Sequence, residues 1–457
     1  MAFVQLFEFF SIILHKLFNE RYFRLMKKIL FAVLMLANMT LCFAQSGTNS
    51  PYSQYGFGVL SEQSSGFNRG MNGVGLGFRE HNQVNNLNPA SYSSIDSLTF
   101  IFDAGVSGQI TNFSENGKKK NAKNADFEYV VAGLRLAPHV GVSFGVIPFT
   151  NVGYSYTNTG FVNNLKTSSF TNSYSGSGGI HEVYLGFGWE PFKGFSFGVN
   201  GGYIWGGYNK TLVNNYTESY ANTLTKNYMA DVHSYKVDFG LQYSVKLAKN
   251  DQLTLGLTYG LGHKIGGNAR CQVIMRNSQT SVSDTTNYPK KDGLNLELPH
   301  MFGAGFAYNH ANKLKFGVDY SLQQWSKVEY PEYYTVNDLP VYALRKDMFK
   351  DRHKVTIGGE YCPSATSKKF LKSIRYRAGV SYATPYLKIN GADGPKEISA
   401  SVGFGIPIIN IHNTRSILNI SGQWVHQNSK SFITENTFRI NIGLTFNEKW
   451  FAKWKIE

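Results

Sequence analysis

Proline and cysteine are scarce in this chain, and long apolar runs are missing after its first 44 residues. The 457 residues include 13 prolines and 3 cysteines. Once the leader described below is removed, only Cys271 and Cys362 remain, which is too few for a disulfide framework. No later stretch approaches the ~18 continuous apolar residues that a membrane helix needs. If the chain enters a membrane, it must do so with strands.

Acidic residues are also in deficit, since 45 Lys and Arg stand against 30 Asp and Glu. A basic chain can bind nucleic acid, but such chains usually gather their cations in a block or stripe. Here the cations are scattered among strand-like segments, which favours charged loops and a charged interior. We therefore expect no nucleic-acid partner.

The N-terminus has the features of an export signal. Met26-Lys27-Lys28 gives a charged start, residues 29–43 are mostly apolar, and Cys42 and Ala44 give a small-residue cleavage site. We predict cleavage after Ala44 and a true start at Met26, with residues 1–25 as an extension. A lipoprotein signal at Cys42 is disfavoured by the bulky Leu41 before it.

What is abundant is aromatic residues and glycine, arranged in repeated period-two alternation. In residues 235–247 the odd positions are mainly apolar or aromatic and the even ones polar or glycine, and residues 314–322 and 438–446 behave alike. The polar face carries charge in mid-strand: Asp238, Lys315, Asp319, Arg375, Arg377 and Arg439. A soluble sandwich also alternates, but these charges fit a polar lumen with lipid outside.

The connections between these segments alternate in length. Short links, such as 138–139 and 309–312, follow every second segment, and long ones, such as 209–232, follow the others. This sorting is typical of an outer-membrane barrel with short periplasmic turns and long outer loops. We predict an all-β transmembrane antiparallel barrel of about 14 strands over residues 97–447, followed by a periplasmic tail, 448–457. The predicted strand starts are near 97, 127, 140, 180, 194, 233, 251, 300, 313, 352, 372, 396, 415 and 434.

Residues 45–96 show no such alternation and are rich in Gly, Ser and Asn, ending in Asn88-Pro89-Ala90. With the export signal, the strand number, Pro299 before the eighth strand and Trp325 after the ninth, the chain resembles the FadL family of outer-membrane transporters for long-chain fatty acids and aromatic hydrocarbons. The resemblance implies that residues 45–96 form a hatch that plugs the lumen. It also implies passive uptake of hydrophobic molecules and their lateral release into the membrane at a kinked third strand.

Pro148 is the candidate for that kink. The third strand begins at Val140, and its apolar residues continue at even positions through Val152, Tyr154 and Tyr156, which we expect to share one face. Proline cannot donate a ladder hydrogen bond. The site is therefore either a bulge or gap that serves as a lateral gate, or the point where the strand ends at the outer interface.

Two hatch arginines are candidates to bind a ligand carboxylate. Arg69 and Arg79 flank the glycine run of the hatch. The alternative is that they pair with lumen carboxylates such as Asp238, Asp319 or Glu360 and hold the plug in place. Asn88, Pro89 and Ala90 are predicted to form the corner between plug and first strand, because Pro fixes φ and pushes Asn88 extended.

No nucleophile motif, metal-ligand spacing or cofactor fingerprint stands out, so we expect neither catalysis nor a cofactor. A hydrolase is the least favoured function. The main expectation is a monomeric channel for hydrophobic small molecules, in contact with outer-membrane lipid and lipopolysaccharide. A shuttle barrel that binds exported proteins, as in type IX secretion, is the alternative.

Overall fold

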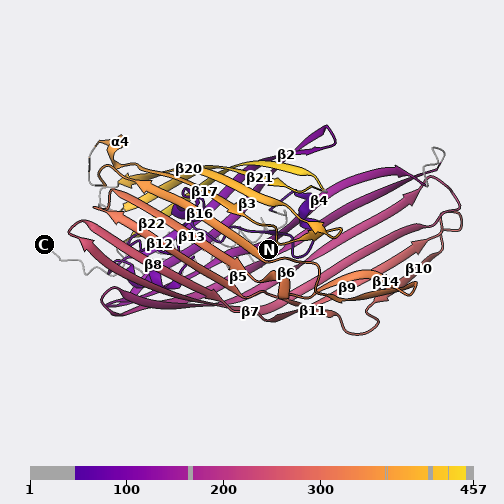
Figure 1. Ribbon diagram of the computed structural model, residues 1–457, viewed down its shortest axis with the longest axis horizontal. Helices are drawn as coiled ribbons and strands as arrows, with labels where there is room; N and C mark the ends of the chain where they lie inside the picture. Colours follow the sequence, from indigo (N-terminus) through magenta and orange to yellow (C-terminus); the bar gives the residue numbers. More distant parts are fainter. Residues whose placement is uncertain are drawn as a thin grey trace, which may run out of the picture. The chain divides into compact units, whose positions relative to one another are not determined.

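The structure is a computed structural model that describes residues 47–162, 168–365, 367, 369–409, 415–430 and 432–448 (Figure 1). The predicted leader and most of the predicted tail lie outside the described residues. Among the described helices, none is long and apolar enough to cross a membrane.

The described chain forms a closed antiparallel barrel of 14 strands, as predicted. In chain order the barrel strands are β2 (Phe100–Glu115), β3 (Lys118–Ala137), β4 (Val140–Phe161), β5 (Ser169–Phe192), β6 (Phe195–Tyr216), β7 (Thr223–Ala248), β8 (Asp251–Gly260), β12 (Met301–His310), β13 (Leu314–Gln323), β16 (Arg352–Tyr361), β17 (Arg375–Ala383), β20 (Lys396–Ile409), β21 (Arg415–Asn428) and β22 (Thr434–Glu448). Each pairs with the next, and β22 closes the barrel on β2 through pairs from Phe100↔Glu448 to Ser114↔Thr434.

Shorter elements lie in the outer loops and at one rim. β9 (Lys264–Arg276), β10 (Ser283–Tyr288) and β11 (Leu294–Glu297) extend the sheet beside β7, while β14 (Tyr330–Val336) with β15 (Leu339–Arg345) and β18 (Lys388–Ile389) with β19 (Ala392–Asp393) form separate hairpins. The 3-10 helix η4 (Trp325–Lys327) follows β13, and α4 (Phe370–Ser373) lies between β16 and β17. Cys271 on β9 and Cys362 after β16 are both free.

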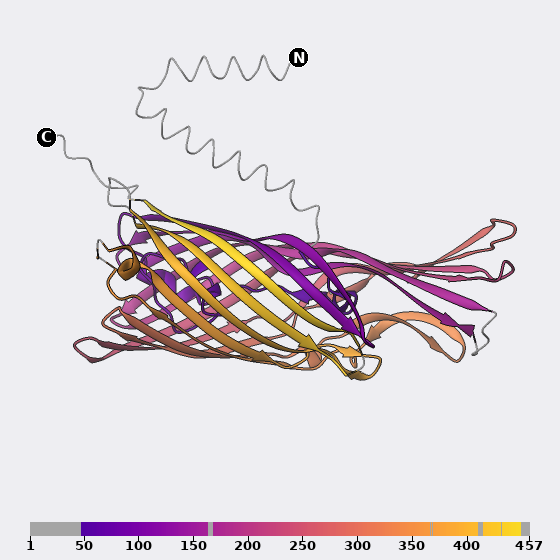
Figure 2. The ribbon, with the colours of Figure 1, turned by 90° about the horizontal axis from the view of Figure 1, so that it is seen from above.

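The barrel has walls of very unequal length (Figure 2). β4 to β7 have 22, 24, 22 and 26 residues, whereas β8, β12, β13 and β16 have 10 each. At ~3.3 Å per residue, the longest strands extend roughly 40–50 Å further than the shortest. The predicted starts of β3, β5 and β7 are late because these outer stretches carry polar residues on both faces, so alternation no longer marks them.

An apolar belt on the outer face marks the membrane level. On β5 it runs from Trp189 through Leu185 to Val183, all exposed. Its outer edge carries a row of histidines stacked on aromatic rings: His181 on Trp205, His233 on Tyr203, His263 on Tyr235, His300 on Tyr259 and His426 on Trp424. Aromatic girdles at this level are typical of outer-membrane barrels.

The hatch fills the lumen. It contains η1 (Pro51–Gln54), the two-residue strand β1 (Val59–Leu60), the single-turn helix α3 (Gly66–Arg69) and η2 (Pro89–Ser94). Most of its side chains are buried, including Phe67, Met71 and Val74, which pack together with Phe78. Residues 47–99 thus form a plug with its own small apolar core inside the barrel.

Candidate functional site

The barrel wall is interrupted between β3 and β4. β3 pairs with β4 only from Val130↔Val146 to Ala137↔Val140, although both strands continue well beyond this point on the outer side. Above it, β3 pairs with β2 and β4 with β5, so two strand edges face each other without a shared ladder. Figure 1 shows the β2–β3 hairpin diverging from β4.

Pro148 lies at the base of this interruption. Its pairing partner on β5 is His181, whose ring belongs to the outer edge of the apolar belt. The register shifts between Pro148 and Thr150, which makes Phe149 the extra residue of a β-bulge. The strand continues to Phe161, so the alternative that it ends near Pro148 is wrong.

The hatch covers the exposed edge of β4 at this bulge. β1 pairs antiparallel with β4 through Val59↔Asn151 and Leu60↔Thr150, and the Ser61 amide donates to the Phe149 carbonyl over 3.0 Å. The Gln63 side chain donates to the Pro148 carbonyl over 2.7 Å. The hatch thus satisfies backbone groups that the bulge removes from the ladder.

The bulge also changes which residues of β4 face the lumen. Below it, even-numbered Phe144 is exposed on the outer face, whereas above it Val152 and Tyr154 are buried in the cluster that contains the hatch residue Phe57. The prediction that the even positions share one face is therefore wrong. The extra residue shifts the period-two alternation, which sequence parity alone does not reveal.

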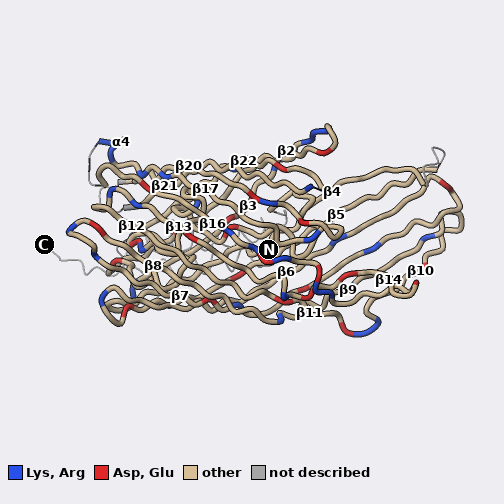
Figure 3. The backbone as a smooth tube through the Cα atoms, viewed as in Figure 1, with Lys and Arg blue, Asp and Glu red and all other residues tan. Residues whose placement is uncertain are grey.

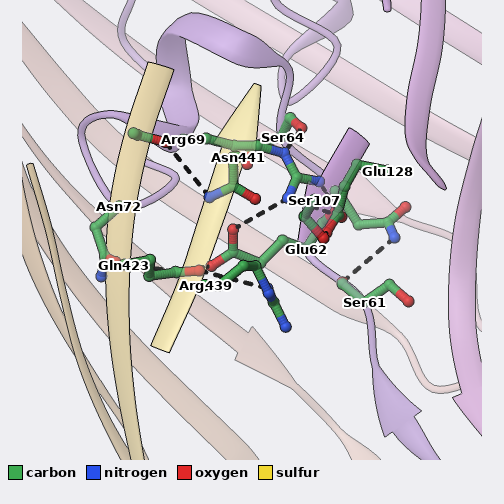
Figure 4. Close-up of polar contacts among 12 residues, drawn as sticks. Ser61, Glu62, Ser64, Arg69, Asn72, Ser107, Glu128, Gln423, Arg439 and Asn441 are labelled. Atoms are coloured by element: carbon green, nitrogen blue, oxygen red, sulfur yellow. Dashed lines mark hydrogen bonds and ion pairs between the residues drawn. The ribbon is translucent and has the colours of Figure 1, made fainter. Parts of the chain in front are cut away.

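Arg69 is bound by protein carboxylates (Figure 4). Its guanidinium lies 2.8 Å from a Glu128 oxygen on β3 and 3.8 Å from a Glu62 oxygen in the hatch, and it donates to the carbonyls of Ser64 and Glu62. Glu128 in turn accepts from Ser107 over 2.5 Å. Because Arg69 is only 2 % exposed, its charge serves to fix the hatch to the wall.

Arg79 also pairs with a carboxylate of the wall, near the rim with the short turns. It lies 2.7 Å from the Glu190 carboxylate and contacts Ser93 and Ser196. Thus both arginines have wall partners, although not Asp238, Asp319 or Glu360. Asp319 instead accepts from the amides of Gly75 and Leu76, and Asp238 pairs with Lys236.

Glu360 is the centre of another buried charge cluster. Its carboxylate lies 2.7 Å from Arg377, 3.2 Å from Arg375 and 3.6 Å from Lys315, and Lys315 also contacts the hatch residue Glu80 at 2.5 Å. This cluster joins β13, β16 and β17 to the plug.

The Asn88-Pro89-Ala90 corner is fixed to the wall. The Asn88 side chain caps η2 by accepting from the Ala90 amide, and donates to the carbonyls of Leu76, Leu241 and Leu257. Pro89 lies so close to β5, β6 and β7 that a Cβ at Gly188, Gly198 or Gly240 would come within about 2.7 Å of its atoms. The corner is an anchor as well as the turn towards β2.

Aromatic rings close the outer mouth. Trp325, fully buried, lies 5.5 Å from the ring of Phe57 and 5.4 Å from that of Phe349, and Tyr386 completes the cluster. The Gly56 carbonyl of the hatch accepts from Lys210 and from the Tyr330 hydroxyl. Pro299, the other residue of the family resemblance, is buried two residues before β12.

A cavity of about 250 Å³ lies between hatch and wall. Its lining includes Val59, Leu60, Leu76 and Leu87, but many charged residues surround it: Glu62, Asp126, Glu128, Asp319, Arg352, Lys354, Glu397, Glu435 and Arg439. Sites for apolar ligands are lined predominantly by apolar and aromatic side chains. This cavity is suited to water and polar groups.

These features define the class: an outer-membrane-type barrel with a lumenal hatch and an interrupted wall. The BamG family model matches residues 25–457, and the chain belongs to that family. No match is found among curated protein sequences.

Solved structures share the fold at low sequence identity. The Pseudomonas putida toluene transporter TodX superposes with a TM-score of 0.58 at 14% identity, covering 86% of this chain and 100% of that one. A Pseudomonas aeruginosa FadL homologue gives 0.57 at 12% identity, with 85% and 99% covered. The Ralstonia pickettii toluene transporter TbuX gives 0.54 at 12%, with 84% and 98% covered. The FadL-like fold inferred from sequence is thereby confirmed.

Sequence reasoning missed the carboxylates that hold the hatch and the aromatic closure of the mouth. Glu62 and Glu128 lie where alternation is weak or interrupted by a bulge, so no pattern marks them as inward-facing. The sequence places Trp325 after the ninth strand, but its contact with Phe57 joins segments far apart in sequence.

Proposed function

We propose that this protein is a plugged barrel of a Gram-negative outer membrane that binds other exported polypeptide chains, without catalysis and without a cofactor. The observation that carries this proposal is the charge of the lumen. The cavity is surrounded by charged side chains, and Arg69, Arg79 and Glu360 hold the hatch across several strands. Releasing such a plug would leave buried charges unpaired, at a cost of about 3–5 kcal/mol for each broken pair.

The unequal walls support the same proposal. A transmembrane strand needs only about 9–11 residues, a length that β8, β12, β13 and β16 match. β4 to β7 have at least twice that length, and the excess extends beyond the belt on the side of the long loops. Such a wall offers surface to a macromolecule outside the membrane.

The test is to purify the protein in detergent after mild cross-linking in its own membrane and to identify everything bound to it by mass spectrometry. We expect defined polypeptides at stoichiometric yield and no lipid in the lumen. Fatty acid or hydrocarbon in the lumen, with no polypeptide partner, would contradict the proposal. Heat-modifiable migration on a gel checks that the barrel is folded.

Uptake of hydrophobic compounds is the second candidate, favoured by the interrupted wall. The gap between β3 and β4 begins at the outer edge of the belt, where β1 covers Thr150 and Asn151 of β4, and the fold is shared with toluene transporters. Under this hypothesis the hatch would move away from β4 to release a ligand sideways. The ligand class would be fatty acids or aromatic hydrocarbons.

A disulfide lock separates the two candidates. Leu60 and Thr150 are direct pairing partners, so Leu60→Cys with Thr150→Cys can fasten β1 to β4. If the gap is a release route, uptake of labelled fatty acid should fall on oxidation and recover with reductant. Each single variant is the control, and uptake that does not respond to the lock rejects this route.

A further inference from the structure

The upper edge of β4 is a strand edge left open beyond the hatch. β1 covers it only at Thr150 and Asn151, and the Ser53 hydroxyl bonds both the amide and the carbonyl of Gly153 at 3.1 Å. From Ser155 to Phe161, no described strand pairs with this side of β4, although the other side pairs with β5 throughout. Ser155, Thr157 and Thr159 are exposed.

The direction of the backbone groups follows from the contacts lower down. Gly153 directs its N–H and C=O away from β5, towards the hatch. Because these groups alternate along an antiparallel strand, those of Ser155, Thr157 and Thr159 point the same way. They form a row of donors and acceptors along the opening.

This edge lacks the protection that exposed strand edges usually have. Natural edges are guarded by lysine, proline, inward charges or bulges. The stretch from Ser155 to Phe161 contains none of these, and its residues are Ser, Tyr, Thr, Asn, Thr, Gly and Phe. The outer part of β3 is guarded, since Lys118, Lys119, Lys120 and Lys123 are all exposed. Figure 3 shows basic positions in blue at the tip of the β2–β3 hairpin.

We propose that the edge of β4 from Ser155 to Phe161 binds an extended segment of another exported polypeptide by antiparallel strand addition. β1 already pairs antiparallel with the adjacent residues, so the incoming strand continues an existing line of pairing. The exposed lysines of β3 lie on the outer part of that strand, beyond its last pair with β4, and they favour a segment that carries carboxylates. The inference rests on the proposed function and names its binding site and the type of partner.

The test places a photoreactive benzoylphenylalanine at residue 159 in cells and compares edge variants. Thr157→Pro removes an N–H that points away from β5, so the hydrogen bonds between β4 and β5 stay intact. Thr157→Val is the matched control that keeps this N–H. We expect a polypeptide adduct in the parent protein and in Thr157→Val, and at least ~10-fold less in Thr157→Pro. Ser155→Lys with Thr157→Lys is a second block that does not alter backbone geometry.

Charge is tested separately. Replacing Lys118, Lys119 and Lys120 with Gln should lower the adduct yield about threefold, an effect that salt should mimic. Heat-modifiable migration confirms that each variant is folded.

The outcomes separate the two levels of inference. A polypeptide bound equally by Thr157→Pro, Thr157→Val and the lysine block keeps the proposed function and overturns strand addition at β4. No polypeptide partner by either cross-linking method overturns both. An adduct that contains only this chain would show pairing between two copies and would also overturn the proposal.

Discussion

The hatch is held differently at two levels of the lumen. Towards the rim with short turns, ion pairs join it to the wall: a partly buried one between Arg79 and Glu190, and a buried cluster of Lys315, Glu80 and Glu360. At the outer mouth, aromatic rings around Trp325 and hydrogen bonds to Gly56 hold it, and no carboxylate pairs with Lys210 among the described contacts.

The difference shows where the plug can open. A buried ion pair is costly to break because both partners lose their compensation at once. Aromatic contacts are lost gradually and can be replaced by other apolar groups. We therefore expect the outer loop at Gly56 to open more readily than the inner half of the plug.

The largest effect is expected from Glu360→Ala. Removing this carboxylate leaves Arg375, Arg377 and Lys315 without their shared partner, which should destabilise the protein by about 3–5 kcal/mol. Urea unfolding followed by gel migration measures the loss. Asp393→Ala, which breaks the exposed pair with Lys350, is the control and should change little. Equal losses in both variants would show that the buried Glu360 cluster stabilises the protein no more than an exposed pair does.

Trp325→Ala should affect the mouth alone. The lost packing corresponds to about 3 kcal/mol, and it should appear as faster amide exchange around Phe57 with the inner hatch unchanged. Trp424→Ala removes an equally large ring from the outer face and should leave hatch exchange as it was. If Trp325→Ala also loosens α3, the two levels are coupled.

The smallest effect is a pH dependence at Lys210. Burial lowers the pKa of this amine to about 7, below its ordinary value of 10.5. The open state therefore binds the proton more tightly between pH 7 and 10.5, so closure of the loop should strengthen as pH rises through this window. Amide exchange at Gly56 and Gly58, corrected for its intrinsic pH dependence, measures this. Lys210→Met should abolish this pH dependence. If the pH dependence persists in the variant, another titrating group causes it.

Much of the barrel could be predicted from sequence, because lipid on one side and polar groups on the other force alternation. The starts at Val140, Asp251 and Arg352 illustrate this, since each begins a clean period-two segment. Counting these alternating segments predicts the 14 strands that form the barrel.

The rest depends on contacts that no local pattern records. β5 begins at Ser169, 11 residues before the predicted start, because its outer part is not in contact with lipid and needs no apolar face. The partners of Arg69 and Arg79 are set by how the hatch folds against the wall, which the sequence alone leaves open. The faces of β4 reverse at a bulge beside Pro148. The proline indicates in the sequence that the strand is irregular there, but it does not indicate that the two faces exchange.

The bulge has a genetic consequence. Phe149 has no pairing partner on β5. The stretches of β4 before and after it each alternate between lumen-facing and outward-facing side chains. Deleting it would restore one-to-one pairing with β5 without turning any other side chain over. In terms of the gene, this bulge corresponds to one codon.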